Sequence, residues 1–183
     1  MQRIGKWLLG LLLAVLAVDL LVQLLRPVKL MGFFTNDDEN LFPASALEKE
    51  YHEAVGGRIV FDDSIYILPG SGDPLVTASS SKMVASIAAK ELDFIVSPRE
   101  VYEHYAPALK MADIKSLVPT LRDDQFLSKT DAKGKTIKAA LDLAESRLLK
   151  DKHPSRSYYL YIPANSIRRK ATADFIRWLF DQK

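Results

Sequence analysis

The stretch from Ser79 to Val96, SSSKMVASIAAKELDFIV, places a helix pattern directly before a strand pattern. Serines at its start are residues that commonly cap helices, and apolar side chains then recur at helical spacing. We therefore predict a helix near residues 80–91, followed by a buried strand at Asp93–Val96. The residues of the apolar helix face are Met83, Val84, Ile87 and Ala88.

The sequence upstream predicts a similar succession of elements. The apolar run Val28–Phe34 is typical of a strand. Ser45 and Glu48 have the spacing of a capping box, which predicts a helix that ends at the following glycine pair. Residues 58–61 predict the next strand, and residues 69–74, rich in proline and glycine, predict a loop.

The sequence downstream continues the alternation. Pro98 has the position of a helix's first turn, and the polar residues 120–135 predict loops. Residues 137–148 predict an amphipathic helix, and a strand at Tyr158–Ile162 and a helix at 167–179 complete the chain. The apolar residues of the amphipathic helix are Ile137, Leu141, Ala144 and Leu148. The order predicts a three-layer α/β domain with a mainly parallel sheet.

The N-terminal run from Trp7 to Leu25 is apolar except at Asp19 and Gln23. Its 19 residues approach the roughly 20 that span a bilayer as a helix. The basic residues Arg3 and Lys6 precede it, as in a signal anchor. A cleaved secretory signal and a buried or interfacial helix are the alternatives.

We predict an N-terminal membrane anchor at residues 1–27, with its helix near 7–25, and one extracytoplasmic domain at residues 28–183. Asp19 either contacts a partner helix inside the membrane or is a tolerated carboxylate near the interface. The absence of cysteine agrees with a location outside the cytoplasm. We therefore expect a single-pass protein of the cell membrane.

The composition argues against several classes of function. Because the chain has no cysteine, disulfides, thiolate metal sites and cysteine nucleophiles are excluded. Its 25 basic and 23 acidic residues are too balanced to indicate a nucleic-acid partner. His52, His104 and His153 lack the spacing of metal ligands. With no cofactor motif in the sequence, we expect no metal, no cofactor and no catalytic residue.

Two stretches resemble the extracellular solute-binding proteins of bacterial ABC importers, the type II periplasmic-binding-protein family. Lys82–Val96 is similar to a helix that ends in that family's "A-A-G-E-L-D" turn, and a strand follows it. Tyr159–Phe180 is similar to a strand "I-P-x-N-S" followed by a helix "A-x-x-F-I-x-W-L". Residues 28–183 are too few for two lobes, so the resemblance implies one lobe, reduced and tethered to the membrane. It also implies a structural role for Asp93.

The loop after the first strand is the leading candidate for ligand contacts. Thr35, Asn36, Asp37 and Asp38 follow that strand. Ligands of open α/β sheets bind outside the carboxyl ends of the strands. A calcium site, which needs more oxygen ligands than are visible here, and a solvated loop are the alternatives.

Two further pairs of residues are candidates for ligand contacts. Ser80 and Ser81 could bind an anion at a helix start, or they could serve only as caps. Tyr159 and Tyr161 share one face of the predicted strand, where they could stack on a sugar or pack in the core. The basic residues 168–170 form either a solvated helix side or a contact with anionic headgroups.

These observations favour a non-enzymatic, membrane-anchored binding domain that binds a small solute such as a carbohydrate beside a transporter or a sensor. The rival hypothesis is a protein-interaction module on the same fold, without a ligand cleft. A third hypothesis is a hydrolase that uses Asp37 or Asp38 with a second carboxylate, but the sequence pairs neither residue with a partner.

Overall fold

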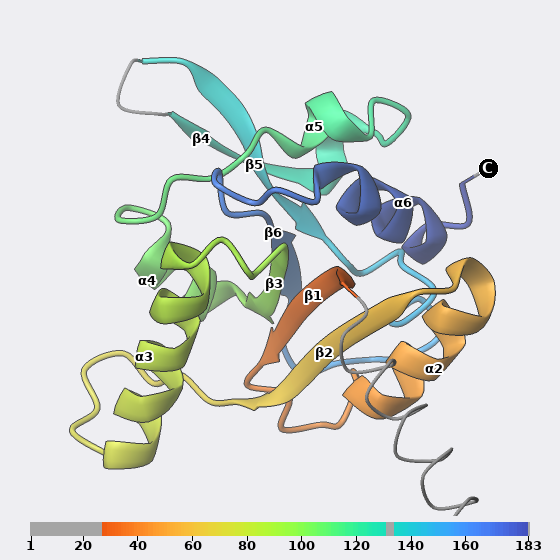
Figure 1. The fold of residues 1–183 in the computed structure, drawn as a ribbon. Coiled ribbons are helices and arrows are strands. Elements are labelled where there is room, and N and C mark those ends of the chain that lie inside the picture. The colour runs from red at the N-terminus through yellow and green to blue at the C-terminus, as the bar shows by residue number, and fades with distance from the viewer. Residues whose placement is uncertain (1–26, 131–133, 183) are drawn as a thin grey trace, which may run out of the picture.

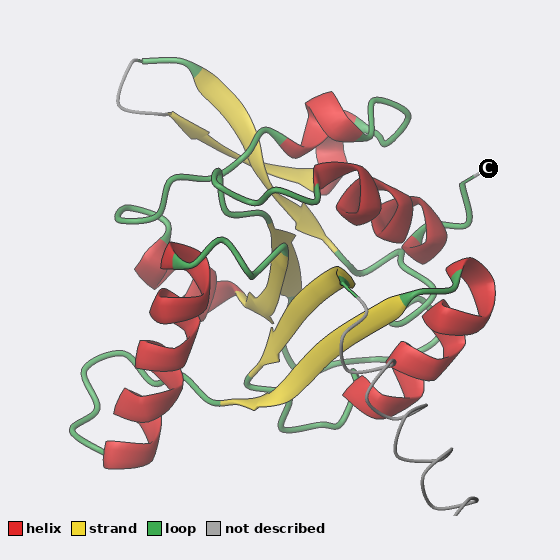
Figure 2. Cartoon of the chain, in the orientation of Figure 1, coloured by secondary structure: helices red, strands yellow, loops and turns green. Residues whose placement is uncertain are grey.

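The computed structural model describes residues 27–130 and 134–182, which form an α/β fold with helices on both faces of a six-stranded sheet (Figure 1, Figure 2). The strands are β1 (Val28–Thr35), β2 (Arg58–Ile65), β3 (Phe94–Pro98), β4 (Phe126–Thr130), β5 (Thr136–Asp142) and β6 (Tyr158–Tyr161). The helices are α2 (Ala44–Val55), α3 (Pro74–Ala88), α4 (Arg99–Tyr105), α5 (Ile114–Leu117) and α6 (Arg169–Leu179), with a 3₁₀ turn at Asp123–Gln125.

The sheet is mixed, with the strand order β2-β1-β3-β6-β5-β4. Strand β1 pairs in parallel with β2 and β3, whereas β6 pairs antiparallel with β3 and β5, and β5 pairs antiparallel with β4. The expectation of a mainly parallel sheet is therefore wrong. Only the half built from residues 28–98 is parallel, and the strands of the other half alternate in direction.

Two neighbouring residues of β1 show how the layers are built. Successive side chains of a strand point to opposite faces, so Phe33 and Phe34 belong to different apolar clusters. Phe34 packs in the cluster that contains residues of α2, α5 and α6. Phe33 packs in the cluster that contains residues of α3 and α4. Both rings are fully buried, which places a core on each side of the sheet.

A close approach between β1 and β3 fixes one residue type in the core. A Cβ atom on Gly32 would lie 2.0 Å from Cζ of Phe94, so only glycine leaves room for that ring. Phe94 in turn stacks on Phe175 of α6, with ring centroids 4.7 Å apart. The glycine therefore allows the last helix of the chain to pack against the central strands.

Two helices begin earlier than the sequence predicted. Helix α3 begins at Pro74, and the carboxylate of Asp73 caps it by accepting the N–H of Leu75 at 2.7 Å. Helix α2 begins at Ala44, and Ser45 makes no cap. Its expected partner Glu48 instead accepts the N–H of Phe61 at 2.5 Å and thereby joins α2 to β2.

The prediction for residues 120–148 is wrong in type. The expected loop contains β4, and the expected amphipathic helix is β5 followed by turns. A spacing of four residues fits a helix face, but it is also a multiple of the strand period of two. An ideal strand would therefore also place Ile137 and Leu141 on one face, but a register shift in the pairing with β4 separates them into different apolar clusters. Pairing with β4 and β6 selects the strand.

The predicted anchor helix at residues 7–25 lies outside the described residues. Within residues 27–130 and 134–182, no helix has both the length and the apolar character needed to cross a bilayer.

Candidate functional site

The order in which the chain connects its first three strands creates a topological switch point between the carboxyl ends of β1 and β3. Strand β1 continues into α2 on one face, whereas β2 leads through α3 on the other face to β3, on the far side of β1. Such a switch point is where ligands of open α/β sheets bind. Thr35 ends β1 and residues 36–38 follow it at this point, so these residues lie at the carboxyl end of the first strand, as the sequence predicted.

Thr35 and Asn36 are buried and serve the fold. Asn36 has a φ of 55°, and its side-chain amide donates to the carbonyl of Ile67 at 2.8 Å and accepts the N–H of Ile67 at 3.1 Å. Its own N–H donates to the carbonyl of Ile65 at 3.0 Å. The amide thus extends the pairing of β1 and β2 by one step. The hydroxyl of Thr35 is buried and has no partner among the described residues.

Asp37 closes the turn that follows the strand. Its two carboxylate oxygens accept the N–H groups of Leu41 and Phe42 at 2.7 and 2.6 Å. These bonds satisfy backbone donors of the loop that leads into α2. The carboxylate is therefore occupied by its own loop.

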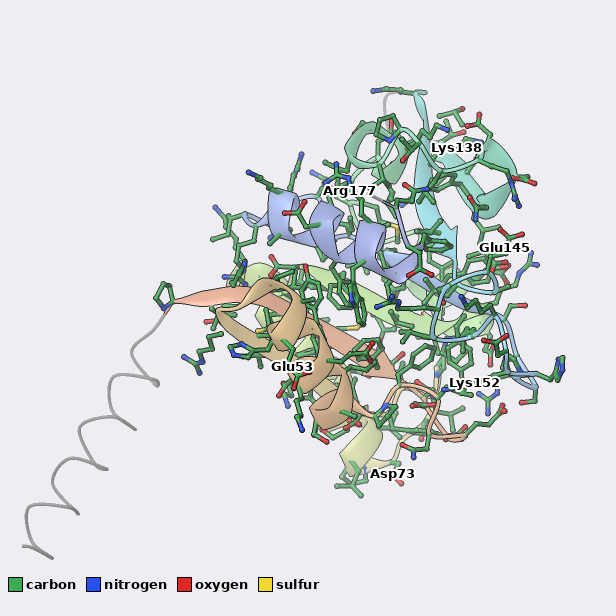
Figure 3. The ribbon with its side chains drawn as sticks, turned by 90° about the vertical axis from the view of Figure 1, so that its right-hand side faces the viewer. Glu53, Asp73, Lys138, Glu145, Lys152 and Arg177 are labelled. Carbon is green, nitrogen blue, oxygen red and sulfur yellow. The ribbon has the colours of Figure 1, made fainter. Side chains whose placement is uncertain are left out.

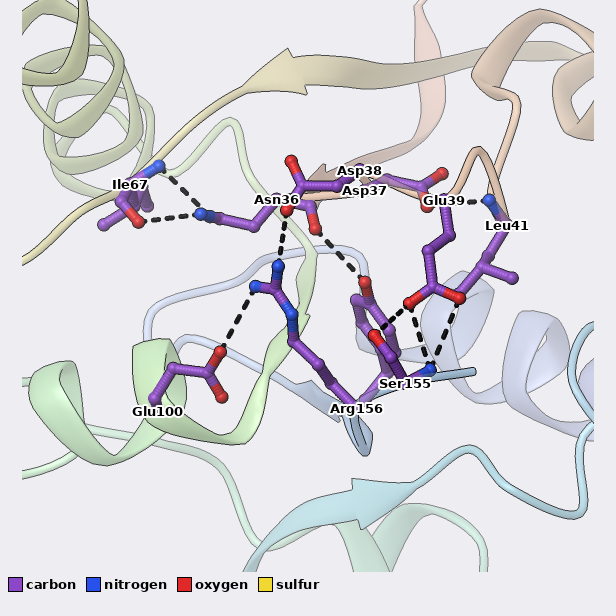
Figure 4. A network of polar contacts seen from close by, with 10 residues as sticks. Asn36, Asp37, Asp38, Glu39, Leu41, Ile67, Glu100, Ser155 and Arg156 are labelled. Carbon is purple, nitrogen blue, oxygen red and sulfur yellow. Dashed lines mark hydrogen bonds and ion pairs between the residues drawn. The ribbon is translucent and has the colours of Figure 1, made fainter. Parts of the chain in front are cut away.

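Arg156 fills the space in front of the switch point (Figure 4). Its guanidinium lies 2.6 Å from the carboxylate of Asp38 and 3.3 Å from that of Glu100, in the first turn of α4. Burial acts to lower the pKa of Arg156, but the hydrogen bond and charge of Asp38, together with the charges of Tyr158 and Glu100, raise it above its ordinary value. The two carboxylates at the ends of β1 and β3 therefore share one cation.

The segment before β6 completes this network. Ser155 donates its N–H at 3.0 Å and its hydroxyl at 2.5 Å to Oε1 of Glu39, and these bonds lower the pKa of the glutamate (Figure 4). The phenol of Tyr158 donates to the carbonyl of Asn36 at 3.1 Å. Burial raises the pKa of Tyr158 to about 12, and the nearby charge of Asp37 adds to this effect. Sequence reasoning missed Arg156 and Ser155, which lie more than 110 residues from Asp38 and Glu39.

Ser80 and Ser81 are not at a helix start. Because α3 begins at Pro74, both serines lie in its interior, where backbone N–H groups are used within the helix. Ser80 is half-buried and Ser81 is exposed. The expected anion contact and the expected capping role at these positions are therefore both wrong.

Tyr159 and Tyr161 share one face of β6, as predicted, but both are buried. Their ring centroids lie 6.2 and 5.3 Å from that of Tyr102 on α4. Burial raises the pKa of each phenol. Of the two expectations for this pair, core packing is confirmed, and no exposed ring face remains for stacking on a sugar.

An open groove of about 570 Å³ lies next to the switch point, between the end of β2 and the first half of α3. Its apolar side chains are unusually exposed for their size: Tyr66 is 42% exposed, Leu68 52% and Leu75 79%. The polar side of the groove includes Ser79 and Lys82. Lys82 forms an ion pair with Asp62 at 2.5 Å, so its charge is partly neutralised.

A second, more polar hollow of about 420 Å³ lies between α2 and the start of β2, where Glu48 and His52 contribute. Both side chains have structural partners there. Glu48 accepts the N–H of Phe61, and the ring of His52 lies 2.7 Å from the carbonyl of Gly57. In the described part of the chain, no three His, Asp or Glu side chains are grouped so that they could hold a metal ion.

Comparison with protein-family models, with curated proteins and with solved structures finds no match to this chain. The resemblance to solute-binding proteins therefore stays a prediction.

Proposed function

We propose that this chain is a non-enzymatic binding domain, anchored to the membrane by residues 7–25 and exposed outside the cytoplasm, that binds an extended segment of a partner protein in the groove beside Tyr66. Of the two binding hypotheses raised by the sequence, this is the protein-interaction module. The observation that carries the proposal is the combination of a filled switch point and an open apolar groove at the neighbouring sheet edge.

The filled switch point is the first argument. The four polar residues expected to contact a solute there are either buried or bonded within the fold, as are the two tyrosines. The carboxylates of Asp37 and Asp38 accept backbone N–H groups or pair with Arg156. Because both carboxylates are engaged in these bonds, they are not free to act as a general acid or base, which weighs against the hydrolase hypothesis.

The groove edge is the second argument. Strand β2 is the outermost strand on its side of the sheet. Ile65 and Ile67 use backbone groups toward Asn36, so the alternating backbone groups of Tyr66 point away from β1. Among the described residues, the backbone of Tyr66 takes no hydrogen bond. An extended peptide could pair with it and place alternate apolar side chains on Leu68 and Leu75.

A small solute is the second candidate occupant. The groove volume of about 570 Å³ falls within the range of small-molecule sites, roughly 300–1,000 Å³. Lys82 and Ser79 could supply polar contacts to a carbohydrate or another solute. In this case the domain would pass or report a solute to a transporter or a sensor in the same membrane.

Site-specific photocrosslinking in intact cells tests the protein partner. A photoreactive amino acid at position 66 or 75 is expected to give the same discrete protein adduct. The matched control is position 84, because Val84 is 51% exposed on the same helix but does not line the groove. No adduct at the groove positions, or the same adduct at position 84, would contradict the proposal.

A thermal-shift panel of sugars and oligosaccharides separates the two occupants. A solute at 100 times its Kd would add about 2.7 kcal/mol to the free energy of unfolding. Stabilisation that disappears in Leu75→Lys but persists in Val84→Lys would favour the solute over the protein partner.

The topology has its own test, because the chain contains no cysteine. Gly72 lies in an exposed loop, and nothing lies near the position of an added Cβ, so Gly72→Cys is expected to fold normally. A membrane-impermeant maleimide should label this variant in intact cells. Labelling only after lysis would contradict an extracytoplasmic domain.

A further inference from the structure

The edge of the domain at which β1 begins also contains the start of α6. Strand β1 begins at Val28, which pairs with Arg58 at the start of β2. Asp93, just before β3, accepts the N–H of Met31 at 2.8 Å and pairs with Arg168 at 2.7 Å. Figure 3 shows the start of β1 and one end of α6 on the same side of the molecule. Residues far apart in sequence therefore meet at this edge.

Basic side chains predominate at this edge. The segments that form it are residues 28–31, 52–58, 88–93 and 164–170, and they contain six Lys or Arg residues against three Asp or Glu residues. The basic residues, which we call the basic edge, are Lys29, Arg58, Lys90, Arg168, Arg169 and Lys170. The acidic residues are Glu53, Glu91 and Asp93. Asp93 has no exposed side-chain surface, so it presents no charge directly to the solvent.

An exposed apolar side chain lies within the basic edge. Ile167 is 68% exposed, and the residues on either side of it are held in place. Ser166 and Arg168 both bond to the carboxylate of Asp93, at 2.9 and 2.7 Å. The isoleucine is therefore presented at a fixed position between basic side chains, an arrangement suited to the boundary between headgroups and acyl chains.

We propose that the basic edge docks on the anionic phospholipid headgroups of the bilayer to which the chain is anchored. The charge is complementary to such a surface, where each Lys or Arg strengthens binding about fivefold. The described chain begins at residue 27, next to the start of β1 at this edge, and the 19-residue apolar run precedes it in the sequence. The edge therefore faces the bilayer as soon as that run is inserted.

Docking at this edge would fix the direction of the groove. Helix α3 ends near the basic edge, because the carbonyl of Ile87 accepts the side-chain N–H of Asn165 at 2.7 Å. The other end of α3 lines the groove. With 15 residues, the helix is about 22 Å long. The groove would then face away from the membrane, where a partner protein could reach it.

A pair of single-cysteine variants on α3 tests the orientation in the full chain. Ala89→Cys lies at the basic edge and Ala78→Cys lies 11 residues earlier, about 16 Å along the helix axis. Each variant is labelled with a fluorophore and reconstituted into vesicles that contain a headgroup-quencher lipid. One set contains 30% phosphatidylglycerol and the other only phosphatidylcholine. We expect at least threefold stronger quenching at position 89 than at position 78, in the anionic vesicles only.

Charge reversal on the basic edge is a second test, and the same reversal elsewhere is its matched control. Arg169→Glu with Lys170→Glu is expected to abolish the difference between positions 89 and 78, because both changes reverse charge on the basic edge. Acidic residues are favourable in a helix's first turn, so α6 should remain folded. Arg99→Glu with Lys150→Glu makes the same change in charge at the opposite end of the domain and should leave the difference intact.

Salt supplies the last readout. At 1 M salt, where the screening length falls to about 3 Å, quenching at position 89 is expected to fall to the level in neutral vesicles. The proposal would be overturned by equal quenching at positions 89 and 78, or by no quenching in anionic vesicles. It would also be overturned if charge reversal at positions 169 and 170 left the quenching unchanged. None of these results depends on what binds in the groove.

Discussion

The guanidinium of Arg168 lies 2.7 Å from the carboxylate of Asp93, a side chain with no exposed surface. The same carboxylate accepts the hydroxyl of Ser166 and the N–H of Met31. It therefore joins the starts of β1, β3 and α6 through one buried charge. A buried carboxylate in this position is stable only while its donors remain.

Removal of the cation alone should be more damaging than removal of both charges. Arg168→Ala is expected to lower the free energy of unfolding by about 3 kcal/mol, because Asp93 would stay buried without its ion partner. The double variant Arg168→Ala/Asp93→Asn should be more stable than the sum of the single effects predicts. Urea unfolding of the four proteins measures this coupling, and strict additivity would contradict it.

The contact between Gly32 and Phe94 predicts a second large effect. Gly32→Ala should destabilise the fold by about 3 kcal/mol, because the new Cβ would overlap the ring of Phe94. Gly72→Ala is the control, since nothing lies near its added Cβ, and it should change stability by less than about 0.5 kcal/mol. Similar melting temperatures for the two variants would show that the ring can move aside.

Replacing the side-chain amide of Asn36 with a carboxylate should destabilise the fold. Asn36→Asp replaces the donor to the carbonyl of Ile67 with an acceptor, and should cost about 2 kcal/mol. Asn40→Asp is the matched control, because Asn40 also has a positive φ, of 51°, but is exposed. If both substitutions have equal effects on urea unfolding, the amide of Asn36 contributes only through its backbone conformation.

Alkaline pH should destabilise the domain partly through Tyr158. Burial raises its folded-state pKa to about 12, above the value near 10 of an unfolded tyrosine. The associated stability is complete below pH 10 and is lost as the pH rises toward 12, by about 2 kcal/mol for a full shift.

Tyr158→Phe should therefore reduce the fall in the free energy of unfolding between pH 8 and pH 11. Tyr66→Phe, which removes the hydroxyl of a side chain that is 42% exposed, should retain the slope of the unaltered protein. A slope in Tyr158→Phe equal to that of the unaltered protein would assign the alkaline loss to other groups.

Local patterns in the sequence were sufficient for the parallel half of the fold. The strands at Val28–Phe34 and Asp93–Val96 and the final helix all occur at nearly their predicted positions, because each combines a clear period with a turn or cap signal. The region of β4 and β5 could not be assigned, since its apolar spacing fits both periods. Long-range pairing with β6 decides the outcome there.

The sequence predicted where the candidate site lies, but not that its side chains are bonded within the fold. Topology alone puts Thr35 to Asp38 at the carboxyl end of β1, and the structure agrees. That Arg156 pairs with Asp38 and Ser155 bonds to Glu39 follows from a return of the chain more than 110 residues later. No pattern of spacing encodes such a contact. The exposed edge at Tyr66 gave no sequence signal either, because its alternation resembles that of any short strand.

Helix α6 is synthesised after the other described elements, and its Phe175 is in ring contact with Tyr51, Phe61 and Phe94. Until residue 179 has emerged, the nascent chain therefore holds a bare aromatic surface. Deletion of residues 169–179 should leave that surface permanently uncovered, and we expect the altered chain to aggregate or to be degraded by quality-control proteases.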